Sequence, residues 1–172
     1  MEIELLLKDK LIKPKEKTEI ISKMILDRKI NLNELILIAQ KAKESDRATC
    51  IEAIEFATKS NPSISTLECL EFVAGTLTEK APRVKWESAK VIANIAPLFP
   101  NNLEIAIKNL LSNTESSGTV VRWSAALALG EIIKMKTAIN QELIPAIESI
   151  CEQEEKNSIK KIYIAALKKA KN

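Results

Sequence analysis

A residue pattern that returns every 37 or 38 positions is the feature of this chain that most constrains its fold. The pattern starts at Asp46, Val84, Val121 and Ile159, and mostly small or aliphatic residues recur four, seven, eight and eleven places after each start. The resulting stripe consists of Cys50, Ser88, Ala125 and Tyr163; Ala53, Val91, Ala128 and Ala166; Ile54, Ile92, Leu129 and Leu167; and Ala57, Ile95, Ile132 and Ala170. This spacing places the stripe on one face of a helix. The sequence therefore predicts four helices that each bury the same face.

Apolar residues recur at three- and four-residue intervals along almost the whole chain, with Pro, Asn and Ser clusters at the breaks. The breaks divide the chain into ten predicted helices, at 2–12, 15–29, 33–44, 46–59, 63–78, 82–97, 101–113, 119–136, 139–154 and 157–171. Because the connections are short, neighbouring helices should pack antiparallel. A single helical hairpin with one apolar flank is not stable alone and must stack on another. We therefore predict an all-α superhelix of five antiparallel hairpins.

The segments RVKWESAKVIANI and VVRWSAALALGEII resemble the second helix of a HEAT repeat. The resemblance covers residues 31–171, which would form repeats of about 37–38 residues. The first two predicted helices are more closely spaced, so we expect residues 1–30 to form an atypical N-terminal capping hairpin within a single domain, 1–172. The resemblance implies a right-handed superhelix whose second helices line a concave surface. It also implies that the generic activity of the chain is binding.

A basic residue stands one place after each start of the repeat. These residues are Arg47, Lys85, Arg122 and Lys160. In the HEAT pattern such a residue is commonly paired with an acid about six positions earlier, and the pair links successive repeats. Glu79 and Glu154 have this spacing before the two lysines, whereas Lys41 and Ser116 occupy the place before the two arginines. We therefore expect structural ion pairs at the lysines and freer arginines, with contact to anionic groups of a partner as the alternative.

The two tryptophans stand at matching places, two residues after the start of adjacent repeats and off the apolar stripe. Lys90 follows Trp86 by four places, and Leu127 follows Trp123 by four, so each pair shares a helix face. Stacked helices lie about 8–10 Å apart, and two rings on neighbouring helices would form a continuous shelf. Trp is enriched at binding hot spots, which favours a site for a peptide anchor. Packing of the rings against a neighbouring hairpin is the competing interpretation.

The chain contains no histidine, which removes the commonest general base and metal ligand. It also contains no Gly-rich phosphate loop, no HExxH and no GxSxG motif. Cys50, Cys69 and Cys151 are widely spaced, which fits neither a disulfide framework nor a CxxC metal pair, and they are expected to be buried free thiols. Carboxylate pairs such as Glu52 with Glu55 are expected on solvated helix faces. We predict no catalytic residue, no metal and no cofactor.

The balance of 26 basic and 23 acidic side chains gives a net charge of +3, too small to indicate nucleic-acid binding by itself. We expect a noncatalytic scaffold that binds a protein or peptide of acidic or amphipathic character. Two alternatives stay open: a nucleic-acid-binding protein related to the HEAT-like DNA glycosylases, and a relative of the HEAT-type lyases that attach bilin pigments. No apolar run approaches the roughly 20 residues of a membrane span. We expect a cytoplasmic protein without membrane contact.

Overall fold

The computed structural model describes residues 2–172, and within that range it contains ten α-helices, two short 3-10 turns and no strand. The α-helices are α1 (Glu2–Lys8), α2 (Pro14–Leu26), α3 (Leu32–Lys41), α4 (Glu44–Ser60), α5 (Leu67–Thr76), α6 (Pro82–Ile95), α7 (Glu104–Asn113), α8 (Thr119–Lys134), α9 (Asn140–Gln153) and α10 (Asn157–Lys171). The 3-10 turns are η1 (Pro62–Ile64) and η2 (Ala96–Leu98). None of these helices is long and apolar enough to cross a membrane.

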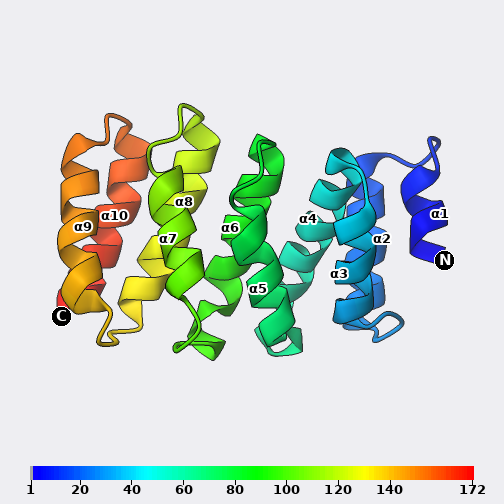
Figure 1. Cartoon of the computed structure of the whole chain (residues 1–172), viewed down its shortest axis with the longest axis horizontal. Helices are drawn as coiled ribbons and strands as arrows, with labels where there is room; N and C mark the ends of the chain where they lie inside the picture. The colour runs from blue at the N-terminus through cyan, green and yellow to red at the C-terminus, as the bar shows by residue number, and fades with distance from the viewer. Residues whose placement is uncertain (1) are drawn as a thin grey trace.

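The helices form two layers along the long axis of the molecule, with the two ends of the chain at opposite ends of the array (Figure 1). One layer is the series α2, α4, α6, α8 and α10, in which each helix packs closely on the next. The second layer is formed by α3, α5, α7 and α9, whose mutual packing is less extensive. The structure is therefore an all-helical repeat solenoid of stacked hairpins, as predicted.

The apolar stripe of the second helices forms the centre of the core. Its residues on α4, α6 and α8 are all fully buried, which confirms the predicted faces. On α10, Tyr163 and Ala166 are buried, whereas Leu167 and Ala170 are half-buried and pack against the core. The difference arises because α10 has a second-helix neighbour on one side only. The division of the sequence into a capping hairpin at 1–30 and repeats from 31 stays a prediction.

Several helix ends differ from the predicted ones because side chains offer the backbone local hydrogen bonds. The first helix was predicted to reach residue 12 but ends at Lys8. The Asp9 carboxylate accepts a hydrogen bond from the Leu11 N–H at 2.8 Å, which favours a turn. The predicted helix 63–78 begins instead as α5 at Leu67, after the Thr66 hydroxyl accepts a hydrogen bond from the Cys69 N–H at 3.2 Å.

Candidate functional site

The two tryptophans lie on the neighbouring helices α6 and α8 and are both half-buried. The Trp86 indole N–H donates a hydrogen bond to the Glu87 carboxylate at 2.9 Å. Trp123 packs partly against the hydrophobic core. Each ring therefore combines a fixed position with an exposed part. We call the surface that contains Trp86, Lys90, Trp123 and Leu127 the second-helix face; that it binds a partner remains a prediction.

Lys90 on α6 lies between two buried carboxylates, Glu87 of its own helix and Glu55 of α4. Its Nζ lies 3.2 Å from an oxygen of Glu87 and 3.7 Å from an oxygen of Glu55. Glu55 and Glu87 are 3% and 4% exposed. Burial raises the pKa of Glu87, while the charge of Lys90 and the hydrogen bond from Trp86 act to lower it. The Lys90 charge is thus partly balanced by carboxylates of the protein itself. The same Glu87 that binds the Trp86 N–H also holds the Lys90 ammonium group in place.

The expectation that Glu52 and Glu55 lie on a solvated helix face is wrong. Glu55 is buried by α6, and Glu52 joins three helices. The Thr18 hydroxyl of α2 donates to Glu52 Oε2 at 3.0 Å, and an Nη of Arg83 on α6 donates to the same oxygen at 2.5 Å. These carboxylates could not be recognised as buried or paired from the sequence of α4 alone, because their partners come from α2 and α6.

Leu127 continues the second-helix face on α8, one turn after Trp123, and is half-buried. Gly130 on the same helix is buried, and a Cβ atom built on it would lie 3.1 Å from the Cβ of Ala166 on α10. The absence of a side chain at Gly130 therefore allows α8 and α10 to approach closely. On α10 this side continues with the exposed residues Lys161 and Lys168. Over α4 and α6 the face carries ionic groups. On α8 it presents Trp123 and Leu127, and on α10 it presents lysines.

Among the basic residues one place after each start of the repeat, the arginines form the ion pairs within the described residues and the lysines do not, which is the opposite of the prediction. Arg47 Nη1 donates to both carboxylate oxygens of Glu79 at 2.8 Å, and Arg122 donates to both oxygens of Glu154 at 3.1 and 3.3 Å. Lys85 and Lys160 form no ion pair with any residue in the range 2–172. The expectation that Arg47 and Arg122 are freer is therefore wrong.

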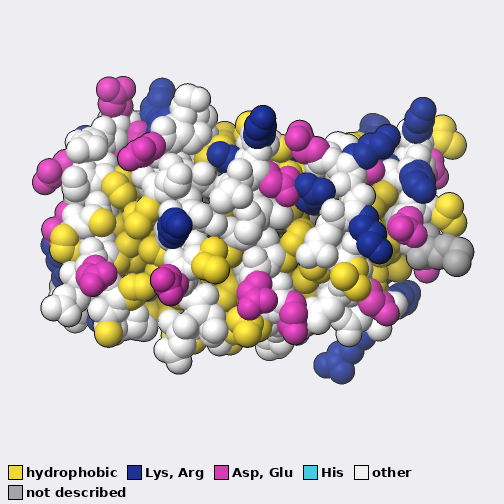
Figure 2. Space-filling view, viewed as in Figure 1, with side chains coloured by type: hydrophobic (Ala, Val, Ile, Leu, Met, Phe, Trp, Pro, Cys, Tyr) yellow, Lys and Arg dark blue, Asp and Glu magenta, His cyan; other side chains and the backbone are white. Residues whose placement is uncertain are grey.

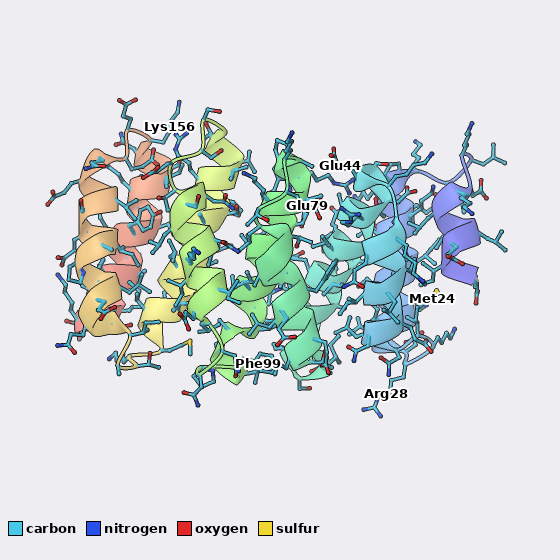
Figure 3. All side chains as sticks on the ribbon, viewed as in Figure 1. Met24, Arg28, Glu44, Glu79, Phe99 and Lys156 are labelled. Atoms are coloured by element: carbon cyan, nitrogen blue, oxygen red, sulfur yellow. The ribbon has the colours of Figure 1, made fainter. Side chains whose placement is uncertain are left out.

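The reason is the direction in which the hairpins stack. Glu79 follows α5 and lies at the same edge of the array as Glu44 at the start of α4 (Figure 3). It therefore meets Arg47 of the preceding hairpin and not Lys85 of its own. Arg47 also donates to the carbonyl oxygens of Ala39 and Ala42 at 3.0 and 3.1 Å. A signal for this pairing was present in the sequence, because each acid follows its arginine by 32 residues.

The cysteines are free thiols, as expected, but Cys151 is only half-buried. Cys50 and Cys69 are buried, and burial raises the pKa of each to about 12. Such thiols stay protonated at neutral pH and are poor nucleophiles. In the described part of the chain, no three His, Cys, Asp or Glu side chains are grouped so that they would hold a metal ion.

No family model matches the sequence, and no curated protein is significantly similar to it. Solved structures of similar fold include a designed armadillo repeat protein in complex with the peptide (KR)4, with 19% identity, coverage of 98% of this chain and 80% of that chain, and a TM-score of 0.73. An engineered protein has 18% identity, coverage of 98% and 79%, and a TM-score of 0.75. The complex of CpcE and CpcF of phycocyanin lyase from Nostoc sp. PCC7120 has 16% identity, coverage of 95% and 96%, and a TM-score of 0.74. These similarities show that the chain has the fold of a helical repeat solenoid.

Proposed function

We propose that this chain is a noncatalytic, HEAT-like scaffold that binds a protein or peptide partner through its second-helix face. The observation that carries the proposal is the pair of half-exposed tryptophans at matching positions of α6 and α8. Elsewhere the second helices use their apolar residues mainly to pack the core. Trp offers a large apolar area together with a polar N–H, which is why it is frequent at binding hot spots.

The surroundings of Trp86 fix its position before any partner arrives. Its N–H is bound by Glu87, and Lys90 is held between Glu87 and Glu55. Side chains that are already ordered lose little conformational entropy on binding. This arrangement favours a recognition surface over a flexible patch of solvated side chains.

The partner chemistry follows from the cations that the fold leaves without an ion pair. Lys85 on α6 and Lys160 on α10 belong to this group, and α10 also carries the exposed Lys161 and Lys168. These charges favour an acidic or amphipathic partner segment. Designed armadillo repeat proteins of similar fold were made for modular peptide recognition, and one binds the basic peptide (KR)4. The fold of the present chain thus suits an extended peptide, while its own side chains would set the charge preference.

Several features favour binding over catalysis. The sequence has no imidazole, and the buried thiols have raised pKa values, so the usual nucleophile and base are lacking. Two of the basic residues that would contact nucleic-acid phosphates, Arg47 and Arg122, are engaged by Glu79 and Glu154. Free thiols are typical of a reducing compartment, and we include a cytoplasmic location in the proposal.

A second candidate is a role as one subunit of a larger enzyme complex. It is favoured by the similarity to the CpcE and CpcF complex of phycocyanin lyase, which extends over almost the full length of both chains. In that role too the chain would contribute a protein-binding surface. Affinity enrichment that recovers one protein in fixed ratio would support a permanent subunit, whereas exchange among several partners would support an adaptor.

The proposal is tested by affinity enrichment from extract of the source cells, with and without nuclease. Wild-type protein is compared with Trp86→Ala/Trp123→Ala and with Leu37→Ala/Ile105→Ala, a control that removes exposed apolar residues from first helices. The tryptophan variant should lose the partner, with each substitution weakening binding by about 2 kcal/mol or more. Equal recovery by both variants, or loss of all specific material after nuclease treatment, would contradict the proposal. Unfolding curves of each variant separate lost binding from lost stability.

A further inference from the structure

A pocket of about 830 Å³ lies at the N-terminal end of the array, away from the tryptophans. Its walls are formed by α1 with the connection to α2, and by the connection between α3 and α4. Figure 2 shows Lys and Arg side chains gathered over this end of the molecule, at the upper right. Its volume is within the range of about 300–1,000 Å³ that is typical of ligand sites.

The floor of the pocket is apolar. It includes Leu7, which is buried, and Ile12, Ile38 and Ala42, which are half-buried. Leu7 and Ile12 come from the N-terminal segment, whereas Ile38 and Ala42 come from α3 and the residue after it. An apolar floor shared by two walls offers burial for an apolar side chain of a ligand.

The rim of the pocket is basic. Five lysines line it, together with three acids. The lysines are Lys8, Lys10, Lys17, Lys41 and Lys43, and the acids are Glu4, Asp9 and Asp46. The Lys17 ammonium group donates to the Leu7 carbonyl oxygen at 2.5 Å, and the Asp9 carboxylate accepts from the Leu11 N–H. The ammonium groups of the other four lysines make no hydrogen bond or ion pair with any described residue, and these lysines are exposed.

These four lysines lie in pairs on opposite walls, Lys8 and Lys10 on one and Lys41 and Lys43 on the other. Like charges that face a common space repel each other, and an anionic group between them relieves the repulsion. The charges sit on flexible stems, and the lining contains no arginine that would orient one small anion by paired hydrogen bonds. The rim therefore fits several carboxylates spread along a chain better than a single phosphate.

We propose that this pocket is a second docking site, which binds a protein segment with an apolar side chain flanked by acidic residues. The apolar side chain occupies the floor beside Leu7 and Ile38, and the carboxylates lie between the two pairs of lysines. The site is independent of the second-helix face, so the chain can hold two partners or two segments of one partner.

The test is a selection of peptides from a random phage-displayed library on the whole wild-type chain. Selected peptides are synthesised with a fluorescent label, and their affinities are measured by anisotropy for wild type and three charge-reversal variants. Lys41→Glu/Lys43→Glu and Lys8→Glu/Lys10→Glu change one wall each. Lys108→Glu/Lys169→Glu makes the same change in charge on exposed residues of α7 and α10 that belong to neither surface, and it serves as the matched control.

Peptides that contain Asp or Glu on both sides of an apolar residue are expected. Reversal of either wall should weaken their binding by about tenfold or more, roughly 1.4 kcal/mol, with little effect of the control. Amide signals of Leu7, Ile38 and Ala42 should shift in NMR spectra on addition of peptide. Circular dichroism verifies folding, and the two wall variants give independent readings if one of them does not fold.

Four results would overturn the proposal: selected peptides without acids, affinities that neither wall reversal changes, binding that is lost in Trp86→Ala/Trp123→Ala, and no selected peptide at all. Phosphate or decanoate that shifts the same amide signals at equal or lower concentration than the peptides would assign the pocket to a small anion. A concentration-dependent mass of the free chain that the wall variants abolish would assign it to self-association.

Discussion

Arg122 on α8 and Glu154 after α9 are joined by two hydrogen bonds, from Nε at 3.1 Å and from an Nη at 3.3 Å. Arg47 and Glu79 are related in the same way two hairpins earlier. In both cases the arginine belongs to the second helix of one hairpin, and the acid belongs to the next hairpin along the chain. The pairs therefore fasten successive hairpins to each other at one edge of the array.

Arg122→Met should lower the free energy of unfolding by about 2 kcal/mol, because it leaves the buried Glu154 carboxylate without its charged partner. Urea unfolding measures the change. Lys85→Met is the matched control, since Lys85 holds the equivalent place in its repeat but forms no ion pair within residues 2–172. It should change stability by less than about 0.5 kcal/mol. Equal losses in the two variants would show that the ion pair does not fasten the hairpins.

The contribution of this pair should depend on pH. Burial by itself would raise the pKa of Glu154, but hydrogen bonds from Arg122 and from the Lys156 N–H, with the Arg122 charge, lower it below the ordinary value of 4.5. A lowered pKa in the folded state means that the stabilisation is complete above the ordinary pKa and is lost as pH falls through the folded one. The difference between wild type and Arg122→Met should therefore shrink below pH 4.5. A difference that stays constant on acidification would contradict this account.

The contribution of Glu87 to stability should change with pH in the opposite direction. Burial raises the pKa of Glu87 above 4.5 despite the Lys90 charge and the Trp86 hydrogen bond, and the Glu52 charge adds to the rise. The folded state then holds its proton more tightly than the unfolded state, so this group lowers stability as pH rises through its raised pKa. Glu87→Gln keeps an acceptor for Trp86 and removes the buried charge. The variant should be at least as stable as wild type at pH 7 and lose that advantage near pH 4.5. Lower stability at neutral pH would mean that the pairing with Lys90 outweighs the cost of burial.

Gly130 provides a test of helix packing beside the proposed binding surface. A Cβ atom at this place would lie 3.1 Å from the Cβ of Ala166, closer than ordinary van der Waals contact. Gly130→Val should destabilise the fold by about 1–3 kcal/mol, because α10 must move away from α8. Ala166→Gly in the same chain should restore part of the loss in thermal unfolding. Additive losses in the double variant would show that the two residues are not in close contact.

The core was predictable from the sequence because the spacing of small and aliphatic residues within one helix determines which face it buries. Val91 and Ala128, for example, are fully buried as their spacing requires. The ion pairs were not predicted, since they join residues of different hairpins. The residue 32 places ahead would have distinguished the paired basic residues from the unpaired ones. Arg47 is followed at that distance by Glu79, whereas Lys85 is followed by Ser117.

The polar part of the second-helix face shows the same limit. Glu55 and Glu87 are buried by the neighbouring helices, and Lys90 reaches both of them. No pattern within α4 or α6 alone distinguishes such a residue from a solvated carboxylate. The exposed part of Trp86 likewise depends on how α6 sits between its neighbours. The site could therefore be predicted as a set of positions on one face, but not as a network of contacts.

The most direct test of the central claim is site-specific photocrosslinking in extract of the source cells. A benzoyl-phenylalanine residue is introduced at Leu127, on the second-helix face, or at Ile105, which is 63% exposed on the first helix α7. The account predicts that the Leu127 position captures a protein, that the Ile105 position does not, and that Trp86→Ala abolishes the capture. Capture of the same protein from Ile105 alone, or equal capture by both positions regardless of Trp86, would contradict it.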